Sequence, residues 1–227
     1  MSASFILTID GPAGVGKSTL AKRAAQALGI AYLDTGAMFR TLALAVERTD
    51  PKLCGEELET FLRGFAFDLR GVGCSTSLLC NGGAVGDEIR SEEAGLAASR
   101  FAVKAEAREV LKELQRALGR TADLVAEGRD MGTVVFPDAR CKIFLDARPD
   151  VRAMRRADQL RGMGQSVDVG ELTEQIRLRD ETDRNRPIAP LKPAADAITI
   201  DTSELDIDAV FARIMEAVRA AGANRPR

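Results

Sequence analysis

The stretch that decides the fold is Gly11-Pro12-Ala13-Gly14-Val15-Gly16-Lys17-Ser18-Thr19, which fits the pattern G-x-x-x-x-G-K-[ST]. The apolar, β-branched run at residues 5–9 before it is typical of a buried strand. After it, apolar residues recur at helical spacing as far as Gly29, where a helix can end. This order of strand, glycine loop and helix favours a phosphate-binding loop over a plain glycine-rich turn. In such a loop Lys17 reaches the β- and γ-phosphates, and the Ser18 hydroxyl binds Mg²⁺.

Length and composition indicate a globular α/β chain. Its 227 residues suit one domain, with room for a lobe inserted into it. The net charge of −2 argues against broad binding to nucleic acid or to a membrane surface. The N-terminal apolar run is short and ends at Asp10, and no apolar run is long enough to span a bilayer, so we expect neither a signal peptide nor a membrane helix. We therefore expect a cytoplasmic protein.

The cysteine and histidine content narrows the possible chemistry. The four cysteines (Cys54, Cys74, Cys80 and Cys141) form no C-x-x-C pair, and the chain has no histidine. A zinc site would need all four thiols at irregular spacing, so we expect reduced cysteines. The lack of histidine excludes Ser-His-Asp and Cys-His catalysis. Proton transfer would have to use carboxylates, lysine, tyrosine or water.

Strand and helix patterns alternate along the chain. We expect strands over residues 5–9, 30–33, 123–128, 141–146 and 197–201. We expect helices over residues 20–28, 38–46, 56–62, 91–101, 104–119, 169–184 and 207–218, and one after Pro149 that carries Arg152, Arg155, Arg156 and Arg161. In the helix over 104–119, Val103 and the later apolar residues share one face, and Gly119 is the expected stop. This alternation predicts a parallel sheet covered on both faces, with ligands beyond the carboxyl ends of its strands.

Two further patterns point to the edge of that sheet and to an insertion. Acidic residues close the predicted strands, namely Asp10, Asp34, Glu127, Asp146 and Asp201. Residues 65–85 alternate between apolar and polar and contain the turn Asn81-Gly82-Gly83, which predicts a small antiparallel meander. Because the meander falls between helical stretches, we expect an inserted lobe.

Arginines are the second signal after the phosphate-binding loop. Residues 127–130 read EGRD, and residues 177–186 read RLRDETDRNR. Such a dense run of charges can form a solvated helix with i,i+4 ion pairs, as between Arg179 and Asp183. Charge-assisted hydrogen bonds to phosphate are the alternative use of these side chains, and a transferring phosphoryl group needs several such donors.

Three ordered segments resemble the bacterial cytidylate kinase family. They are residues 34–40 (DTGAMFR), residues 127–133 (EGRDMGT) and residues 179–186, which read R-D-x-x-D-R-x-R. The similarity runs from about residue 5 to residue 218, and the run GRDMGTVVFPD is its most specific part. The resemblance makes the salt-bridge explanation of the late arginines the weaker one.

The resemblance implies a P-loop three-layer α/β fold with a five-stranded parallel sheet. Residues 1–227 would form a single kinase domain. Within it, residues 35–105 would form the lobe that binds the nucleoside monophosphate (NMP), with a small antiparallel β-insertion at about residues 64–86, and residues 152–168 a short lid. The implied enzyme transfers the ATP γ-phosphoryl group to CMP and dCMP, with Mg²⁺ as cofactor. No apolar heptad demands a partner chain, so we expect a monomer that binds neither nucleic acid nor membrane.

The resemblance also assigns roles to individual positions. The expected ATP-binding residues are Gly11, Pro12, Ala13, Gly14, Val15, Gly16, Lys17, Ser18 and Thr19. The residues expected to contact cytosine are Ser99, Arg108 and Asp130. Those expected to contact the CMP phosphate are Arg40, Arg129 and Arg186, those expected to contact the sugar are Arg179 and Asp183, and Thr35 is expected near the nucleotide. The expected catalytic residues are Lys17, Arg129, Arg155, Arg156 and Arg186, and Mg²⁺ is held by Ser18 directly and by Glu127 through water. Taken alone, Ser99 and Arg108 also suit an exposed helix surface.

Two positions depart from part of the family. Phe39 stands where some members have Tyr, and Glu127 stands where some have Asp, which gives a longer arm toward Mg²⁺. A phosphate dianion is a competent nucleophile, so direct in-line transfer needs no general base and no covalent enzyme intermediate. Two other functions stay open at this point. One is a P-loop kinase of another small molecule, such as shikimate or a sugar acid. The other is a GTPase-type switch, although the guanine-reading motif N-K-x-D does not occur.

Overall fold

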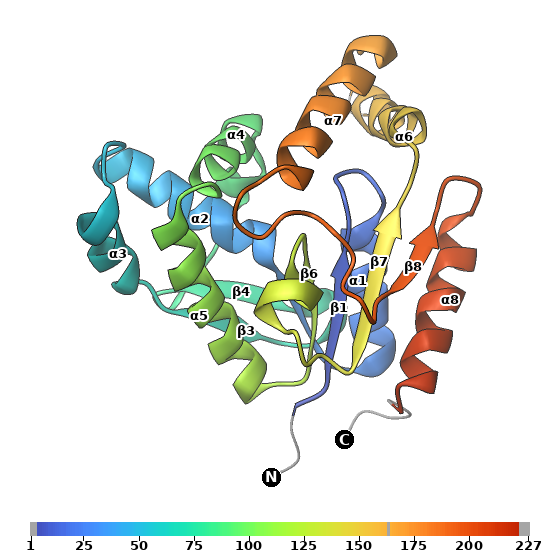
Figure 1. Cartoon of the computed structure of the whole chain (residues 1–227), viewed down its shortest axis with the longest axis horizontal. Helices are drawn as coiled ribbons and strands as arrows, with labels where there is room; N and C mark the ends of the chain where they lie inside the picture. Colours follow the sequence, from blue (N-terminus) through green and yellow to red (C-terminus); the bar gives the residue numbers. More distant parts are fainter. Residues whose placement is uncertain (1–3, 163, 223–227) are drawn as a thin grey trace.

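Five parallel strands form the central sheet (Figure 1). The computed structural model describes residues 4–162 and 164–222. The strands are β1 (Ile6–Asp10), β2 (Ala31–Asp34), β6 (Leu124–Gly128), β7 (Cys141–Asp146) and β8 (Ile198–Asp201). Their order across the sheet is β2-β6-β1-β7-β8, and every pair is parallel. The predicted fold class is confirmed.

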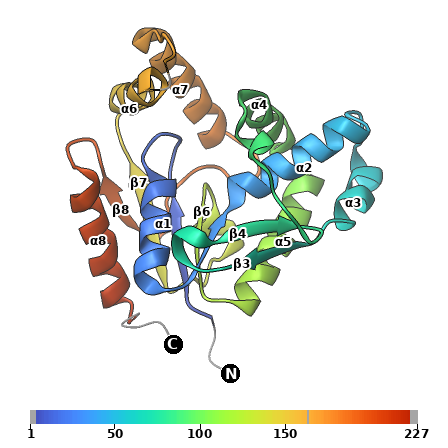
Figure 2. The same ribbon diagram turned by 180° about the vertical axis from the view of Figure 1, so that it is seen from behind.

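Helices cover both faces of this sheet (Figures 1 and 2). They are α1 (Lys17–Leu28), α2 (Thr35–Thr49), α3 (Gly55–Arg63), α4 (Glu92–Phe101), α5 (Ala105–Thr121), α6 (Pro149–Gly162), α7 (Val169–Arg184) and α8 (Ile207–Ala220). One apolar core packs α1 and α8 against the sheet, and a second packs α2, α3, α4 and α5 against its other face. Burial of apolar surface in these two cores is the main force that stabilises the three layers.

The strand register brings the acidic residues to one edge of the sheet. Asp34 pairs with Glu127, and Asp146 pairs with Asp201. Asp10 closes β1 opposite Gly128. The predicted row of carboxylates at the carboxyl ends of the strands is therefore confirmed, and the loop after β1 lies at this edge.

The small antiparallel sheet predicted from residues 65–85 is present. It contains β3 (Phe67–Arg70), β4 (Ser77–Cys80) and β5 (Gly83–Ala84) in that order. The turn before β5 uses a left-handed backbone at Asn81 and Gly82, as an Asn-Gly turn requires. Two 3₁₀ turns, Gly73–Ser75 and Asp87–Arg90, complete this region, and the first of them packs against α1.

Two expectations for the helix over residues 104–119 are wrong. Gly119 does not end the helix, because α5 continues to Thr121. A Cβ atom at Gly119 would lie 2.6 Å from Cε1 of Phe136, so the glycine allows close packing. Val103 lies before α5 and is 54% exposed, so it is not part of the packed face. A π-helical turn at Met131–Val135, inside the GRDMGTVVFPD run, was also not predicted from the sequence.

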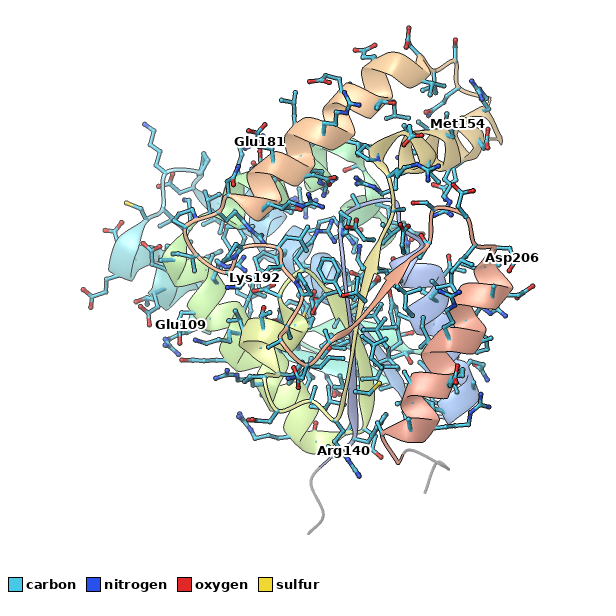
Figure 3. All side chains as sticks on the ribbon, turned by 45° about the vertical axis from the view of Figure 1, so that its right-hand side comes forward. Glu109, Arg140, Met154, Glu181, Lys192 and Asp206 are labelled. Atoms are coloured by element: carbon cyan, nitrogen blue, oxygen red, sulfur yellow. The ribbon has the colours of Figure 1, made fainter. Side chains whose placement is uncertain are left out.

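Helices α6 and α7 pack against each other and project beyond the carboxyl ends of the strands (Figure 1). Figure 3 shows Met154 of α6 and Glu181 of α7 at this end of the molecule, whereas Arg140, just before β7, lies at the opposite end of the sheet. Within the described ranges, no helix combines the length and the apolar character needed to cross a bilayer.

Candidate active site

The G-x-x-x-x-G-K-S loop follows β1 and opens α1, as the motif predicts. Gly11 has a φ of 149°, and a Cβ atom there would lie 2.1 Å from the carbonyl oxygen of Leu145. Gly14 and Gly16 have φ values of 82° and 88°, in the region that glycine adopts without strain. The loop can take this shape only with glycine at these positions, and the first residue of α1 is then Lys17.

Lys17 is a buried ammonium group with few protein partners. Its side chain is 8% exposed, and its Nζ donates a hydrogen bond to the Pro12 carbonyl oxygen over 2.6 Å. Burial lowers the pKa of Lys17 well below its usual range, and the positive charges of Arg129 and Arg179 lower it further. Glu127 opposes this shift only in part. A buried ammonium whose charge is disfavoured by burial and by neighbouring arginines is stabilised when an anion binds beside it.

Glu127, the next-to-last residue of β6, accepts hydrogen bonds from two hydroxyl groups. Ser18 Oγ donates to Glu127 Oε2 over 3.0 Å, and the Tyr32 hydroxyl donates to Oε1. Burial raises the pKa of Glu127, the charge of Asp34 raises it too, and Lys17 opposes both. The carboxylate is 4% exposed. The sequence analysis did not identify Tyr32 as part of this site.

These oxygen donors fit a magnesium ion. Mg²⁺ prefers hard oxygen ligands, keeps several waters, and is usually held by one or two protein groups together with substrate phosphates. Ser18 and Glu127 provide one hydroxyl and one carboxylate side by side. Across the residues with described positions, no group of three or more His, Cys, Asp or Glu residues could hold a metal without other ligands. The ion would thus need phosphate and water for most of its shell.

Arginines gather on the other side of this edge. Arg129 Nε donates to Asp183 Oδ2 over 3.0 Å, and Arg186 Nη1 lies 3.7 Å from Asp183 Oδ1. Burial raises the pKa of Asp183, but Arg129 and Arg186 outweigh it and hold this pKa below its usual value. Arg40 Nη2 lies 3.3 Å from Asp34 Oδ2. Arg40 is thus paired with a carboxylate at the end of β2, whereas Arg129 and Arg186 share one carboxylate of α7.

Part of the hydrogen-bonding capacity of these arginines is unused. The Nε atoms of Arg40 and Arg186 are buried, and neither has a hydrogen-bond partner among the described residues. A buried donor without a partner costs about 1–3 kcal/mol. Unpartnered buried donors of this kind are stabilised when an anion accepts their hydrogen bonds.

Asp10 positions the segment that carries Arg129 and Asp130. Its carboxylate accepts the backbone N–H groups of Met131 over 2.9 Å and Gly132 over 2.7 Å. Burial raises the pKa of Asp10 to about 6, against the lowering effect of these two hydrogen bonds. The sequence placed Asp10 at the sheet edge but gave no sign that it anchors the turn after β6.

Arg108 and Asp130 form a buried ion pair. Arg108 Nη2 donates to Asp130 Oδ2 over 2.5 Å, and both side chains are less than one-tenth exposed. The Arg108 guanidinium lies 5.7 Å from the ring centroid of Phe39, a favourable cation–π distance. These three residues line a cavity of about 190 Å³ together with Gln115, Val134, Val135, Ile188 and Ala189. Gln115, which the sequence analysis missed, is 1% exposed, and its Nε2 has no partner among described residues.

Four predicted site residues either form hydrogen bonds within the protein or lie at its surface. The Thr35 hydroxyl donates to the Glu127 carbonyl oxygen over 2.6 Å, so its proton is used within the protein. Ser99 lies on the exposed face of α4, with no side-chain hydrogen bond in the described part of the chain. Arg155 bonds to Thr202, at 3.0 Å to Oγ1 and 2.6 Å to the carbonyl oxygen. Arg156 is exposed, and its Nη1 donates a hydrogen bond to Gln159 Oε1 over 3.5 Å.

Arg152 was predicted only as one of several arginines in its helix, yet it is the most buried of them. It is 1% exposed and forms a two-point ion pair with Asp180 of α7, one contact of which is 3.0 Å between Nη1 and Oδ1. The same Nη1 donates to the carbonyl oxygen of Ala13 in the glycine loop over 3.2 Å. Arg152 therefore links α6 and α7 to the phosphate-binding loop.

A glycine loop that opens a helix at the carboxyl edge of a parallel sheet, with buried arginines at the same edge, is typical of P-loop phosphotransferases. Comparison with known proteins is more specific. The profile of the cytidylate kinase family matches residues 7–220. The chain belongs to the cytidylate kinase family, as the resemblance in its sequence implied.

Three relatives show the extent of the match. The chain is 58% identical to the cytidylate kinase of Nitratidesulfovibrio vulgaris Hildenborough, over 96% of this chain and 94% of the relative. It is 53% identical to that of Oleidesulfovibrio alaskensis, over 96% of this chain and 100% of the relative. For Lawsonia intracellularis the identity is 48%, over 93% and 94%.

Proposed function

We propose that the protein transfers the γ-phosphoryl group of ATP to CMP and dCMP, giving CDP or dCDP and ADP. The observation that carries this proposal is the group of buried cationic side chains at the sheet edge, in which Arg129 and Arg179 lie close enough to Lys17 to lower its pKa. Lys17 faces the loop, while Arg40 and Arg186 hold buried Nε donors that no described residue uses. One phosphate-binding loop serves a donor, and the separate arginine group serves an acceptor phosphate.

The donor side uses residues 11–19. Their backbone N–H groups and the N-terminus of α1 face the triphosphate, and Lys17 neutralises charge on its β- and γ-phosphates. Ser18 would hold Mg²⁺ directly and Glu127 through water, and the ion would supply charge neutralisation at the phosphate oxygens. Burial and Arg129 lower the pKa of Lys17. This pKa rises when phosphate binds, because the negative charge of the phosphate favours the charged form of the lysine.

The acceptor side binds CMP by its phosphate, sugar and base. Arg40, Arg129 and Arg186 bind the phosphate, and Arg179 and Asp183 bind the sugar hydroxyls. Asp183 already holds Arg129 and Arg186 in place, so one carboxylate orients two of the phosphate ligands. Such positioning, together with charge neutralisation, accounts for catalysis of direct in-line transfer.

The base is read by the buried pair Arg108–Asp130, with Ser99 beside it after closure. Asp130 accepts from the N4 amine of cytosine, and Arg108 donates to the O2 and N3 acceptors. Uracil presents O4 to Asp130, which opposes two acceptors at a cost of about 1–3 kcal/mol or more. The cavity lined by this pair gives the base a partly apolar environment in which that cost is realised.

No general base is needed, because the CMP phosphate dianion is itself a nucleophile. This agrees with a site that contains carboxylates, lysine and arginines and a chain that has no histidine. Closure of the lid, residues 152–168, and of the NMP-binding lobe, residues 35–105, excludes water that would otherwise hydrolyse ATP. Arg155 must leave Thr202 to reach the ATP phosphates during this closure.

Coupled measurement of ADP release tests the proposal. With CMP and dCMP as acceptors the rate should rise strongly, with UMP and AMP weakly, and with shikimate or sugar acids not at all. Acceptor-independent hydrolysis of GTP would instead support a switch protein. Equal rates with all acceptors, or with none, would contradict the proposed function.

A further inference from the structure

We propose that Tyr32 is the residue that positions Glu127, and that its hydroxyl group reports on occupation of the magnesium side of the site. This inference rests on the proposed function, which places Glu127 near Mg²⁺. The chain contains one tyrosine and no tryptophan, so its intrinsic ultraviolet emission comes from Tyr32.

Strand pairing holds the Tyr32 backbone, and core packing holds its ring. Tyr32 lies in β2, in register with Val125 of β6, and its backbone N–H donates to Thr76 Oγ1 over 3.1 Å. The side chain belongs to the apolar core under α1 and is 7% exposed. Lys22 Nζ of α1 lies 5.5 Å from the ring centroid. These contacts leave the phenol little freedom to move away from the sheet edge.

Because of the Tyr32 hydroxyl group, the two oxygen atoms of the Glu127 carboxylate accept hydrogen bonds from different donors. The Tyr32 hydroxyl donates to Oε1, and Ser18 Oγ donates to Oε2. With Oε1 bound by Tyr32, the other oxygen is aimed at Ser18, the residue proposed to bind Mg²⁺ directly. A glutamate arm has one more rotatable bond than aspartate, so fixing it costs more conformational entropy. The Tyr32 hydroxyl offsets this cost by restraining the longer arm.

The hydroxyl can be separated from the packing of the ring. Phenylalanine fills the same core volume, so Tyr32→Phe removes the donor to Glu127 without creating a cavity. Thr76→Val is the matched control. It removes the acceptor for the Tyr32 N–H and loosens the same strand, but leaves the hydroxyl and Glu127 unchanged.

The kinetic test measures the Mg²⁺ concentration that gives half-maximal rate at saturating ATP and CMP. Partners that orient metal ligands typically contribute about 10–100-fold to metal affinity. We expect Tyr32→Phe to need about tenfold more Mg²⁺ with an unchanged KM for CMP, and Thr76→Val to need the same Mg²⁺ as the unmodified protein. Calorimetric titration with ADP and Mg²⁺ should show the same shift without turnover. An unchanged Mg²⁺ requirement in Tyr32→Phe, or an equal shift in both variants, would overturn the proposal.

The optical test compares the tyrosine emission of the unmodified protein with that of Glu127→Gln. A carboxylate that accepts a hydrogen bond from an excited phenol quenches its emission, because the proton moves toward the carboxylate. We expect Glu127→Gln to emit more strongly than the unmodified protein, and Mg²⁺ with ADP to raise the emission of the unmodified protein only. Excitation at the long-wavelength edge of tyrosine absorption limits the light that the adenine ring of ADP absorbs. Equal emission from Glu127→Gln and the unmodified protein would overturn the proposal.

The two experiments separate this inference from the proposed function. If the protein fails to phosphorylate CMP, the emission change on binding Mg²⁺ with ADP still tests Tyr32. If CMP is phosphorylated but Tyr32→Phe needs no more Mg²⁺ than the unmodified protein, and Glu127→Gln emits no more strongly than it, only the role of Tyr32 is wrong.

Discussion

Replacement of Asp130 by Asn tests how the base is chosen. Asp130 Oδ2 accepts from Arg108 Nη2 at 2.5 Å, which leaves Oδ1 for the N4 amine of cytosine. Asn keeps the shape but loses the charge, and its amide can also turn its N–H₂ toward the O4 of uracil. The variant should therefore lose activity with CMP and gain, in relative terms, with UMP.

The size of the effect follows from the burial of the pair. Both side chains are less than one-tenth exposed, so the hydrogen bond from N4 to a charged oxygen contributes about 1.5–3 kcal/mol. We expect kcat/KM for CMP to fall about 10–100-fold. The ratio of kcat/KM for CMP to that for UMP should fall by at least about tenfold, because uracil loses no favourable contact.

Stability must be measured beside activity, because the substitution also breaks a buried ion pair. Breaking such a pair typically costs about 3–5 kcal/mol. Asp180→Asn is the matched control, since it breaks a similarly buried pair, with Arg152, that does not line the cavity of Arg108 and Asp130. Assays of both variants below their unfolding midpoints should show a changed CMP:UMP ratio only for Asp130→Asn. An equal fall with both substrates would refute the base-reading role of Asp130.

The remaining predictions concern the phosphates, the α6–α7 pair and one carboxylate. Lys17→Ala and Arg129→Ala should each lower kcat about 10²–10³-fold in stopped assays, while circular dichroism shows an intact fold. Arg152→Met should lower the free energy of unfolding by about 3–5 kcal/mol in urea titrations, because Asp180 is left buried without its partner. Asp10 holds its proton to a pKa of about 6 in the folded protein against 3.8 ordinarily, so its contribution to stability falls as pH rises from about 4 to 6. Relative to Asp10→Asn, the unmodified protein should lose about 3 kcal/mol across this window.

Each of these predictions has an outcome that contradicts it. Near-normal turnover in Lys17→Ala or Arg129→Ala would remove that residue from the site. A stability of Arg152→Met equal to that of the unmodified protein would show that the buried pair contributes nothing. A stability difference between the unmodified protein and Asp10→Asn that does not vary between pH 4 and 7 would mean that Asp10 is ionised throughout.

The sheet and the row of acids at its edge could be predicted because both depend on local patterns. The glycine loop marks β1 and α1, and in a parallel sheet the ends of strands meet at one edge whatever the strand order. The small meander was likewise marked by its turn residues. The family resemblance then supplied the arginine and aspartate positions that the structure brings together around Asp183 and the Arg108–Asp130 pair.

The missed features depend on contacts between residues far apart in the sequence. Asp10 holds the N–H groups of Met131 and Gly132 more than a hundred residues later, and Tyr32 meets Glu127 across 95 positions. In neither pair does the local sequence around one residue predict its contact with the other. The position of Gly119 inside a helix could not be predicted for the same reason, because the contact that requires glycine there is with the ring of Phe136.

The central claim is that one sheet edge holds a donor and an acceptor nucleotide at once, on opposite sides of the transferred group. Binding of adenosine and cytidine joined by a linear polyphosphate tests it most directly, because this molecule fills both sides. Calorimetry should show binding about 10²–10⁴-fold tighter than ATP alone, with much of the gain lost in Arg129→Ala and on exchange of cytidine for uridine. Binding no tighter than that of ATP, or insensitive to both changes, would contradict the account.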